Sequence, residues 1–279
     1  MGFMVKENSP AHYSFSSFGV GVCLDFDDAG LLDRFKESLQ LIFKGNLSEK
    51  ARSPNDQVIS ARRRDDLDSF LYTFRGEEFE LDAGEIRLFK LLRTLVRVTV
   101  AANTEEKLFI HAGAVSWKGR GLILPAHSNS GKTSLVIELC RLGALYLSDE
   151  YAVLDSNGML LPFPKHLSVR GEGGRFDQQD VDISELGGLA GKDAVPMQMV
   201  LFSEFSQTRF EWIPKRISSG EGLLRLIPHM IAMPVNPAFC LRMGSAAVRE
   251  VPIFEAERGD AKDFAPKILE LLEKSAFLG

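Results

Sequence analysis

Residues 126–133, which read Ala-His-Ser-Asn-Ser-Gly-Lys-Thr, constrain the fold more than any other segment. They follow an apolar run that predicts a strand over residues 120–126, and they precede a run through Leu142 with the apolar spacing of a helix. A strand, a glycine-containing loop and a helix in this order form a phosphate-binding loop. Only the first position departs from the pattern, because Ala126 stands where glycine is usual.

The chemistry of such a loop assigns roles to its polar residues. The Lys132 ammonium reaches the β- and γ-phosphates of a nucleotide, the Thr133 hydroxyl ligates Mg²⁺, and Gly131 lets the backbone approach the phosphates. We therefore expect ATP and Mg²⁺ as cofactors, with GTP as the open alternative. The residues expected to bind the nucleotide are Ser128, Asn129, Ser130, Gly131, Lys132, Thr133 and Ser134.

An acidic pair follows the predicted helix. Asp149 lies 17 residues after Lys132, which leaves room for a helix, a turn at Gly143 and a short strand. A strand–helix–strand unit is right-handed and runs its two strands parallel, so Asp149 is expected at the same sheet edge as the loop. There it can bind Mg²⁺ or accept a proton from a hydroxyl, unless it merely caps a turn. Glu150 is either a second metal ligand or an exposed acid.

The register of a predicted hairpin places a histidine near the loop. Lys118-Gly119 is a two-residue turn signal between strands at 108–117 and 120–126. If Trp117 lies opposite Arg120, then His111 lies opposite Ala126, at the entrance to the loop. A slip of one residue would turn His111 to the other face of the sheet, where it would be a structural side chain.

Periodicity divides the chain into a small α/β region over residues 1–104 and a catalytic region over 105–279. The first region is expected to contain strands within 13–26 and 57–81 and helices over 29–43 and 85–102. The second is expected to form further strands at 144–147, on both sides of a turn at 155–158, near 197–203 and near 208–213, a long loop over 171–195, and helices at 218–230 and 261–277.

Composition narrows the class of partner. The net charge is −5, and the basic run over residues 62–64 is followed at once by acidic residues, so no broad nucleic-acid-binding face is expected. The three cysteines are far apart, which excludes a zinc spacing or a disulfide framework. We find no signal peptide and no apolar run long enough for a membrane helix, and we expect a cytoplasmic location with no membrane partner.

The residues around the loop resemble the catalytic domain of HPr serine kinase/phosphorylases. The resemblance rests on Phe-Ile-His-Ala-Gly-Ala-Val at 109–115, the phosphate loop, Leu-Ser-Asp-Glu at 147–150 and Leu-Ser-Val-Arg-Gly-Glu-Gly at 167–173. It implies a P-loop kinase core of the HPr kinase/PEP carboxykinase type. Because the N-terminal region is unlike that of true HPr kinases, the chain looks closer to the related proteins of bacterial biosynthetic clusters, including those that phosphorylate lasso-peptide precursors.

This resemblance implies particular roles for the site residues. Asp149 is the general base toward the acceptor hydroxyl, and Glu150 is the neighbouring acid. His111 assists at the phosphate, and Arg170 faces the phosphates or the acceptor, although a surface ion pair is its alternative. Because the parent family forms oligomers, the resemblance also implies self-association of this chain.

These observations lead to three hypotheses. The first is a Mg²⁺-ATP-dependent kinase that phosphorylates a serine-type hydroxyl of a peptide or small protein, with the loop at 171–195 as the acceptor clamp. The second is a kinase of a small-molecule hydroxyl. The third is a nucleotide-binding interaction module without transfer chemistry.

Overall fold

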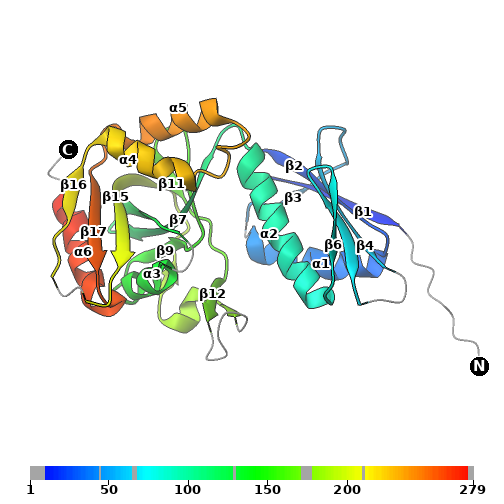
Figure 1. Cartoon of the computed structure of the whole chain (residues 1–279), viewed down its shortest axis with the longest axis horizontal. Coiled ribbons are helices and arrows are strands. Elements are labelled where there is room, and N and C mark those ends of the chain that lie inside the picture. The colour runs from blue at the N-terminus through cyan, green and yellow to red at the C-terminus, as the bar shows by residue number, and fades with distance from the viewer. Residues whose placement is uncertain are drawn as a thin grey trace, which may run out of the picture. The chain divides into compact units, whose positions relative to one another are not determined.

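The computed structural model describes residues 10–43, 45–64, 68–127, 130–170, 178–208 and 211–275. The chain forms two compact units, Met1–Thr104 and Glu105–Gly279, and each contains its own sheet with helices packed on it (Figure 1). The expected α/β class is therefore confirmed. Among the described residues, no helix combines the length and the apolar character needed to cross a membrane.

The first unit is a six-stranded sheet with the strand order β3-β1-β2-β4-β5-β6. The expected strand region at 13–26 is a hairpin that turns at Phe18 and Gly19, both with positive φ. The strands are β1 (Ala11–Ser17), β2 (Val20–Phe26), β3 (Ser48–Glu49), β4 (Gln57–Arg63), β5 (Phe70–Phe74) and β6 (Glu77–Leu81), and the helices are α1 (Ala29–Ile42) and α2 (Glu85–Asn103).

Aromatic side chains hold the first unit together. The Phe35 ring of α1 lies 5.9 Å from the Phe26 ring of β2 and 5.3 Å from the Phe89 ring of α2. Phe26 and Phe35 are fully buried, so the two helices and the sheet share one core. At the start of α1, the Asp28 carboxylate accepts a hydrogen bond from the Leu31 backbone N–H, which fixes where the helix begins.

The second unit is built on a nine-stranded mixed sheet. Its path is β14-β9-β7-β10-β11-β15-β17-β16, and β8 pairs with both β7 and β15. A separate two-stranded sheet is formed by β12 and β13. The strands are β7 (Leu108–Trp117), β8 (Arg120–Pro125), β9 (Leu145–Ser148), β10 (Tyr151–Leu154), β11 (Met159–Leu161), β12 (Leu167–Arg170), β13 (Gln178–Val181), β14 (Leu189–Ala190), β15 (Val195–Phe205), β16 (Lys215–Ile217) and β17 (Ile253–Arg258).

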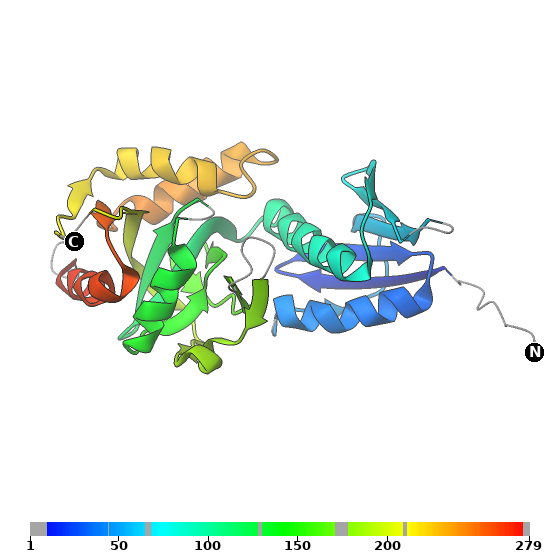
Figure 2. The ribbon, with the colours of Figure 1, turned by 60° about the horizontal axis from the view of Figure 1, so that its bottom comes forward.

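Helices cover both faces of this sheet. On one face, buried residues of α3 and α6 pack against Val115, Leu122 and Leu201. On the other face, residues of α4 and α5 pack against Ile110 and Ile123, and these two helices lie side by side (Figure 2). The helices are α3 (Lys132–Arg141), α4 (Ser219–Leu226), α5 (Pro237–Val248) and α6 (Ala261–Ser275), with short 3₁₀ helices η1 (Ile183–Leu186) and η2 (Ile227–His229).

The strand directions bring two loops to one edge of the sheet. Both β8 and β9 pair with β7 in the antiparallel sense, so they run parallel to each other with β7 between them. The predicted hairpin register is confirmed, because Trp117 lies opposite Arg120 and Ala112 lies opposite Pro125. The ends of β8 and β9, which lead into the phosphate loop and the acidic pair, therefore meet at the same edge.

Several expectations about the second unit were wrong. The described part of the expected loop at 171–195 contains β13, η1 and β14, while residues 171–177 lie outside the described residues. A capping box between Asp182 and Glu185 starts η1, and elements this short show no periodicity in a sequence. Residue 208 and residues 211–213 form no strand, and the Trp212 side chain packs edge-on against the Phe264 ring of α6. Helix α5 and strand β17 were missed.

We predict that Gly113→Ala destabilises the second unit. A Cβ atom on Gly113 would lie 2.7 Å from Val136 Cγ2 and 3.2 Å from Lys132 Cγ, both on α3. Because this contact is in a packed interior, the free energy of unfolding should fall by about 1–3 kcal/mol. Denaturant unfolding followed by tryptophan fluorescence is the measurement, since both tryptophans, Trp117 and Trp212, lie in this unit.

Gly220→Ala is the matched control. Gly220 is in α4, and a Cβ atom there would meet nothing within 4 Å. Helix propensity alone should then leave stability unchanged or raise it by up to about 1 kcal/mol. Equal stability of Gly113→Ala and the unchanged protein would contradict the close approach of α3 to β7.

Candidate functional site

The phosphate loop joins the end of β8 to the start of α3. Gly131 is the N-cap residue of α3 and has a φ of 78°, a conformation that glycine adopts without strain. Ser130 presents a buried hydroxyl without a hydrogen-bond partner among the described residues, and Ser134 is exposed in the first turn of α3. Ser128 and Asn129, which were also expected to bind the nucleotide, lie outside the described residues.

Lys132 places a buried ammonium group at the N-terminal end of α3. The residue is only 9% exposed, and its Nζ has no hydrogen-bond partner in the part of the chain that the structure describes. Burial lowers the pKa of Lys132 to about 8, although Asp149 and Glu150 act in the opposite direction. A buried cation beside a helix N-terminus, with no acceptor of its own, is suited to bind an anion.

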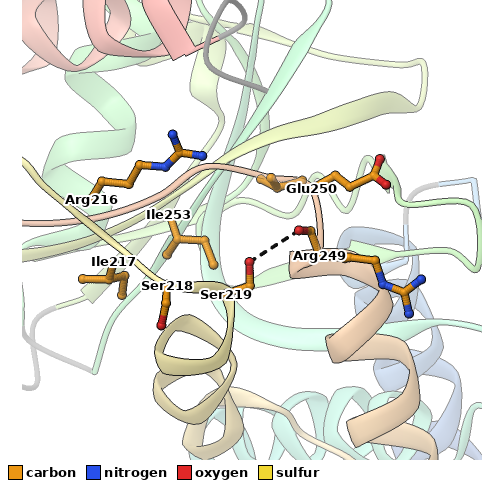
Figure 3. A pocket seen from close by; sticks show the side chains of 8 residues that line it. Arg216, Ile217, Ser218, Ser219, Arg249, Glu250 and Ile253 are labelled. Atoms are coloured by element: carbon orange, nitrogen blue, oxygen red, sulfur yellow. Dashed lines mark hydrogen bonds between the residues drawn. The ribbon is translucent and has the colours of Figure 1, made fainter.

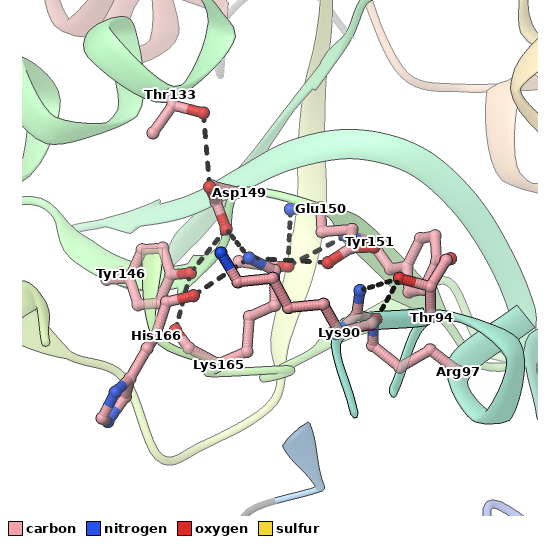
Figure 4. A network of polar contacts seen from close by, with 11 residues as sticks. Lys90, Thr94, Arg97, Thr133, Tyr146, Asp149, Glu150, Tyr151, Lys165 and His166 are labelled. Atoms are coloured by element: carbon pink, nitrogen blue, oxygen red, sulfur yellow. Dashed lines mark hydrogen bonds and ion pairs between the residues drawn. The ribbon is translucent and has the colours of Figure 1, made fainter. Parts of the chain in front are cut away.

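Asp149 follows β9 and faces the start of α3. Its Oδ2 accepts a hydrogen bond from the Thr133 hydroxyl at 3.3 Å (Figure 4). Its Oδ1 accepts from the Tyr146 hydroxyl at 3.0 Å and lies 3.2 Å from the Lys165 ammonium. Asp149 is 6% exposed, so this carboxylate is a fixed, buried group rather than a solvated turn residue.

Glu150 shares a cation with Asp149. Glu150 Oε2 lies 3.5 Å from Lys165 Nζ, and the Glu150 side chain is 20% exposed. The backbone here is also fixed, because the Ser148 hydroxyl accepts a hydrogen bond from the Glu150 N–H, and the Glu150 carbonyl accepts one from Ala112 N–H. The structure thus places Thr133 in contact with Asp149, and Lys165 links Asp149 to Glu150.

Three histidines gather near the loop. Residues 229–231 run beside β7, with an isolated bridge between Ile110 and Met230, so His229 lies next to His111. The rings of His229 and His127 are 4.9 Å apart. The pKa of His111 falls to about 4 through burial and the nearby Lys132 charge, and burial, His127 and Lys132 lower the pKa of His229 to about 4 as well. Both imidazoles are therefore neutral at pH 7.

Arg258 holds the backbone of the phosphate loop through hydrogen bonds. It ends β17 and is 2% exposed. Its Nη2 donates hydrogen bonds to the carbonyl oxygens of Gly131 at 2.9 Å and Ser130 at 3.4 Å, and its Nη1 donates to the Gly259 carbonyl at 3.0 Å. A Cβ atom at Gly131 would lie 2.8 Å from Arg258 Nη2, so glycine is needed for this contact.

Arg170 is the last residue of β12, where its backbone is opposite Gln178 of β13. The structure describes this backbone position but not the Arg170 side chain. Strand β12 begins two residues after Lys165, whose ammonium contacts Asp149 and Glu150. The expected contact of Arg170 with phosphates or an acceptor stays a prediction.

Four contributors to the site were missed from the sequence: Tyr146, Lys165, His229 and Arg258. Lys165 lies in an irregular segment, Pro-Phe-Pro-Lys, which carries no periodic pattern. His229 belongs to a single 3₁₀ turn, and its neighbour on β7 is 118 residues away. Arg258 had a usable signal, because it is a charged residue at the end of the apolar strand positions Ile253, Phe254 and Ala256.

A separate cavity of about 350 Å³ opens between β16, the start of α4 and the end of α5 (Figure 3). It is lined by Arg216, Ile217, Ser218, Ser219, Arg249, Glu250, Val251 and Ile253. None of these residues belongs to the phosphate loop or the acidic pair, so the cavity is not part of the candidate site.

Comparisons with known proteins returned little. No family model matches the sequence, and no curated protein matches it. Among solved structures, the chain is similar to the Hpr(Ser) kinase/phosphatase from Coxiella burnetii, with 13% sequence identity and a TM-score of 0.33. That similarity covers 61% of this chain and 96% of the other. A function for this chain is therefore inferred from its site residues.

We predict that Arg258→Met weakens anion binding. The variant loses the hydrogen bonds to the Ser130 and Gly131 carbonyls, which hold the loop in shape. Charge-assisted hydrogen bonds contribute about 1.5–3 kcal/mol, so the affinity for inorganic pyrophosphate should fall by about 10- to 100-fold. Isothermal titration is the measurement, with exposed Arg242→Met on α5 as the control. Unchanged affinity in a folded Arg258→Met protein would contradict this role.

We also predict a loss of stability in mild acid. Because the folded protein holds His111 and His229 at a pKa of about 4 rather than 6.5, the unfolded chain binds more protons between these values. Unfolding is then favoured as pH falls from about 6.5 to about 4. The free energy of unfolding should decrease across this window.

The double variant His111→Asn/His229→Gln should lose less stability over the same window, because its amides do not titrate. Exposed His12→Gln is the matched control and should behave like the unchanged protein. Denaturant titrations at several pH values, followed by tryptophan fluorescence, provide the comparison. An identical pH dependence in the double variant would show that other groups cause the acid lability.

Proposed function

We propose that the chain is a Mg²⁺-ATP-dependent kinase that transfers the γ-phosphate to a serine-type hydroxyl of a peptide or small protein. The observation that carries the proposal is the buried Lys132 ammonium. It lies at the N-terminal end of α3 without a partner among the described residues, beside the buried Asp149 carboxylate. A cation ready for phosphate and an acid on the same sheet edge are the two parts that phosphoryl transfer to a hydroxyl needs.

The phosphates would bind at the start of α3. Lys132 would neutralise charge on the β- and γ-phosphates, while the backbone of Ser130 and Gly131 and the positive end of the helix hold phosphate oxygens. Arg258 keeps the Ser130 and Gly131 carbonyls turned toward itself, which fixes the backbone of the loop. Neutral His111 can donate a hydrogen bond near the phosphates.

The residues present fit a magnesium ion. Thr133 Oγ1 and Asp149 Oδ2 are 3.3 Å apart, close to the separation of neighbouring oxygens in an octahedral shell, and Glu150 follows Asp149. Thr133, Asp149 and Glu150 would hold the ion. When bound, Mg²⁺ supplies positive charge that neutralises the phosphate oxygens.

The transfer step needs a base for the acceptor hydroxyl. The hydroxyl oxygen attacks the γ-phosphorus, the bond to the β-phosphate oxygen breaks with ADP as the leaving group, and the hydroxyl proton passes to Asp149. Tyr146 and Lys165 hold Asp149 Oδ1, so the carboxylate cannot turn away from the loop. The β12–β13 hairpin, which carries Arg170, extends from this side of the site and would support a peptide acceptor.

The proposal predicts phosphate transfer that depends on Lys132 and Asp149. The protein would be incubated with γ-labelled ATP, Mg²⁺ and a fractionated extract of the source cell. Label should enter a peptide or protein band, and Lys132→Ala or Asp149→Asn should slow its incorporation by about a hundredfold to ten-thousandfold. Lys262→Ala and Asp263→Asn, both exposed on α6, are matched controls that should keep full activity.

Other outcomes would overturn the proposal in distinct ways. Label confined to a small metabolite would identify a kinase of a small-molecule hydroxyl. Tight nucleotide binding without transfer to any fraction would identify a nucleotide-binding interaction module. Transfer that persists in Asp149→Asn would remove Asp149 from the role of base.

A further inference from the structure

Lys165 occupies a defined position between the two acids. Its Nζ lies 3.2 Å from Asp149 Oδ1 and 3.5 Å from Glu150 Oε2, and the residue is 9% exposed (Figure 4). A surface lysine that paired with these acids by chance would be solvated and mobile. Here the ammonium and Asp149 are buried, and the Glu150 side chain is 20% exposed.

Neighbouring hydrogen bonds fix the segment that carries Lys165. The Phe163 N–H donates to the Leu147 carbonyl, which anchors the segment to β9. The Tyr146 hydroxyl shares its single proton between two acceptors, the Lys165 carbonyl at 3.1 Å and Asp149 Oδ1 at 3.0 Å. The Lys165 ammonium donates to the His166 carbonyl at 3.0 Å. One tyrosine therefore ties the backbone of Lys165 to the carboxylate that its ammonium contacts.

The contacts divide the two oxygens of Asp149 between different neighbours. Oδ1 faces Lys165 and Tyr146, whereas Oδ2 faces the Thr133 hydroxyl at the start of α3. Oδ2 is thus the oxygen on the side of the phosphate loop. Lys165 already supplies one positive charge to the acids on the other side.

We propose that Lys165 is the internal counter-ion of Asp149 and Glu150 and that it keeps this acidic pair from binding a divalent cation without a nucleotide. This inference rests on the proposed function for its assignment of the acids to a cation. Two adjacent carboxylates alone attract a divalent cation strongly, whereas a pair that shares an ammonium has one charge less to offer. The phosphates of a nucleotide would supply the missing negative charge, so the metal ion would enter as its nucleotide complex.

The test measures metal binding in the absence of nucleotide. Mn²⁺ is the probe, and its binding is followed by electron paramagnetic resonance and isothermal titration at pH 7.5. The unchanged protein should bind Mn²⁺ weakly. Lys165→Met, which keeps the length of the side chain and removes its charge, should bind Mn²⁺ at least about tenfold more tightly, because one unit of nearby positive charge is lost.

Matched variants locate the effect. Lys165→Arg retains the charge and should bind Mn²⁺ as weakly as the unchanged protein. Asp149→Asn combined with Lys165→Met should lose the gained affinity. Lys215→Met removes the lysine of an exposed ion pair, Lys215 with Glu255 at 3.1 Å, and should leave Mn²⁺ affinity unchanged.

The remaining outcomes also decide the proposal. Equal or weaker Mn²⁺ binding by folded Lys165→Met would overturn it, and so would a gain in Lys165→Arg. If Lys165→Met and Lys165→Gln are unfolded in the absence of metal, refolding on addition of Mn²⁺ would support the proposal, because Mn²⁺ would then replace the lost lysine charge. Failure of both variants to fold with Mn²⁺ would refute it.

Failure of this inference can be told apart from failure of the proposed function. The Mn²⁺ titration contains neither nucleotide nor acceptor, so it does not depend on phosphate transfer. Loss of labelling in Lys132→Ala together with unaltered Mn²⁺ affinity in Lys165→Met would leave the kinase in place and remove only the role of Lys165.

Discussion

The candidate site depends on one constraint, the common direction of β8, β9 and β17. The first two strands are parallel through their shared neighbour β7, and β17 is parallel to β15, which in turn is parallel to β8. All three therefore end at one edge of the sheet. Their ends carry the phosphate loop, the acidic pair and Arg258, so residues distant in the sequence form one charged site without any long side chain having to reach across the fold.

The three buried cations of this site, Lys132, Lys165 and Arg258, have different partners. Arg258 donates hydrogen bonds to the carbonyls of Ser130, Gly131 and Gly259 and lies over the Phe205 ring, whereas the Lys165 ammonium contacts the two acids and the His166 carbonyl. The Lys132 ammonium, by contrast, has no hydrogen-bond acceptor in the described part of the chain. Arg258 and Lys165 are therefore bound to neighbouring protein groups, whereas the Lys132 ammonium is left for the ligand that the proposed function requires.

The sequence was sufficient to predict the structure where the interactions that form it are local. The register of β7 against β8 followed from the two-residue turn at Lys118-Gly119, and α3 followed from its loop and apolar spacing. Prediction failed where distant segments decide the structure. Arg258 contacts the phosphate loop and His229 lies beside β7, and both of these partners are more than 100 residues away in the sequence. The backbone of Lys165 is held by the Tyr146 hydroxyl, which no sequence pattern around Lys165 indicates. The elements missed within 178–195 are too short for periodicity to show.

The support that Arg258 gives to the phosphate loop has a consequence for synthesis of the chain. The contact between Arg258 and Gly131 spans 127 residues, and β17 joins the sheet only through β15 and β16. As the ribosome extends the chain, residues 1–104 can complete their own sheet early, because all its pairings are internal. The phosphate loop is synthesised well before Arg258, so the candidate site stays incomplete in the nascent chain until β17 has been translated.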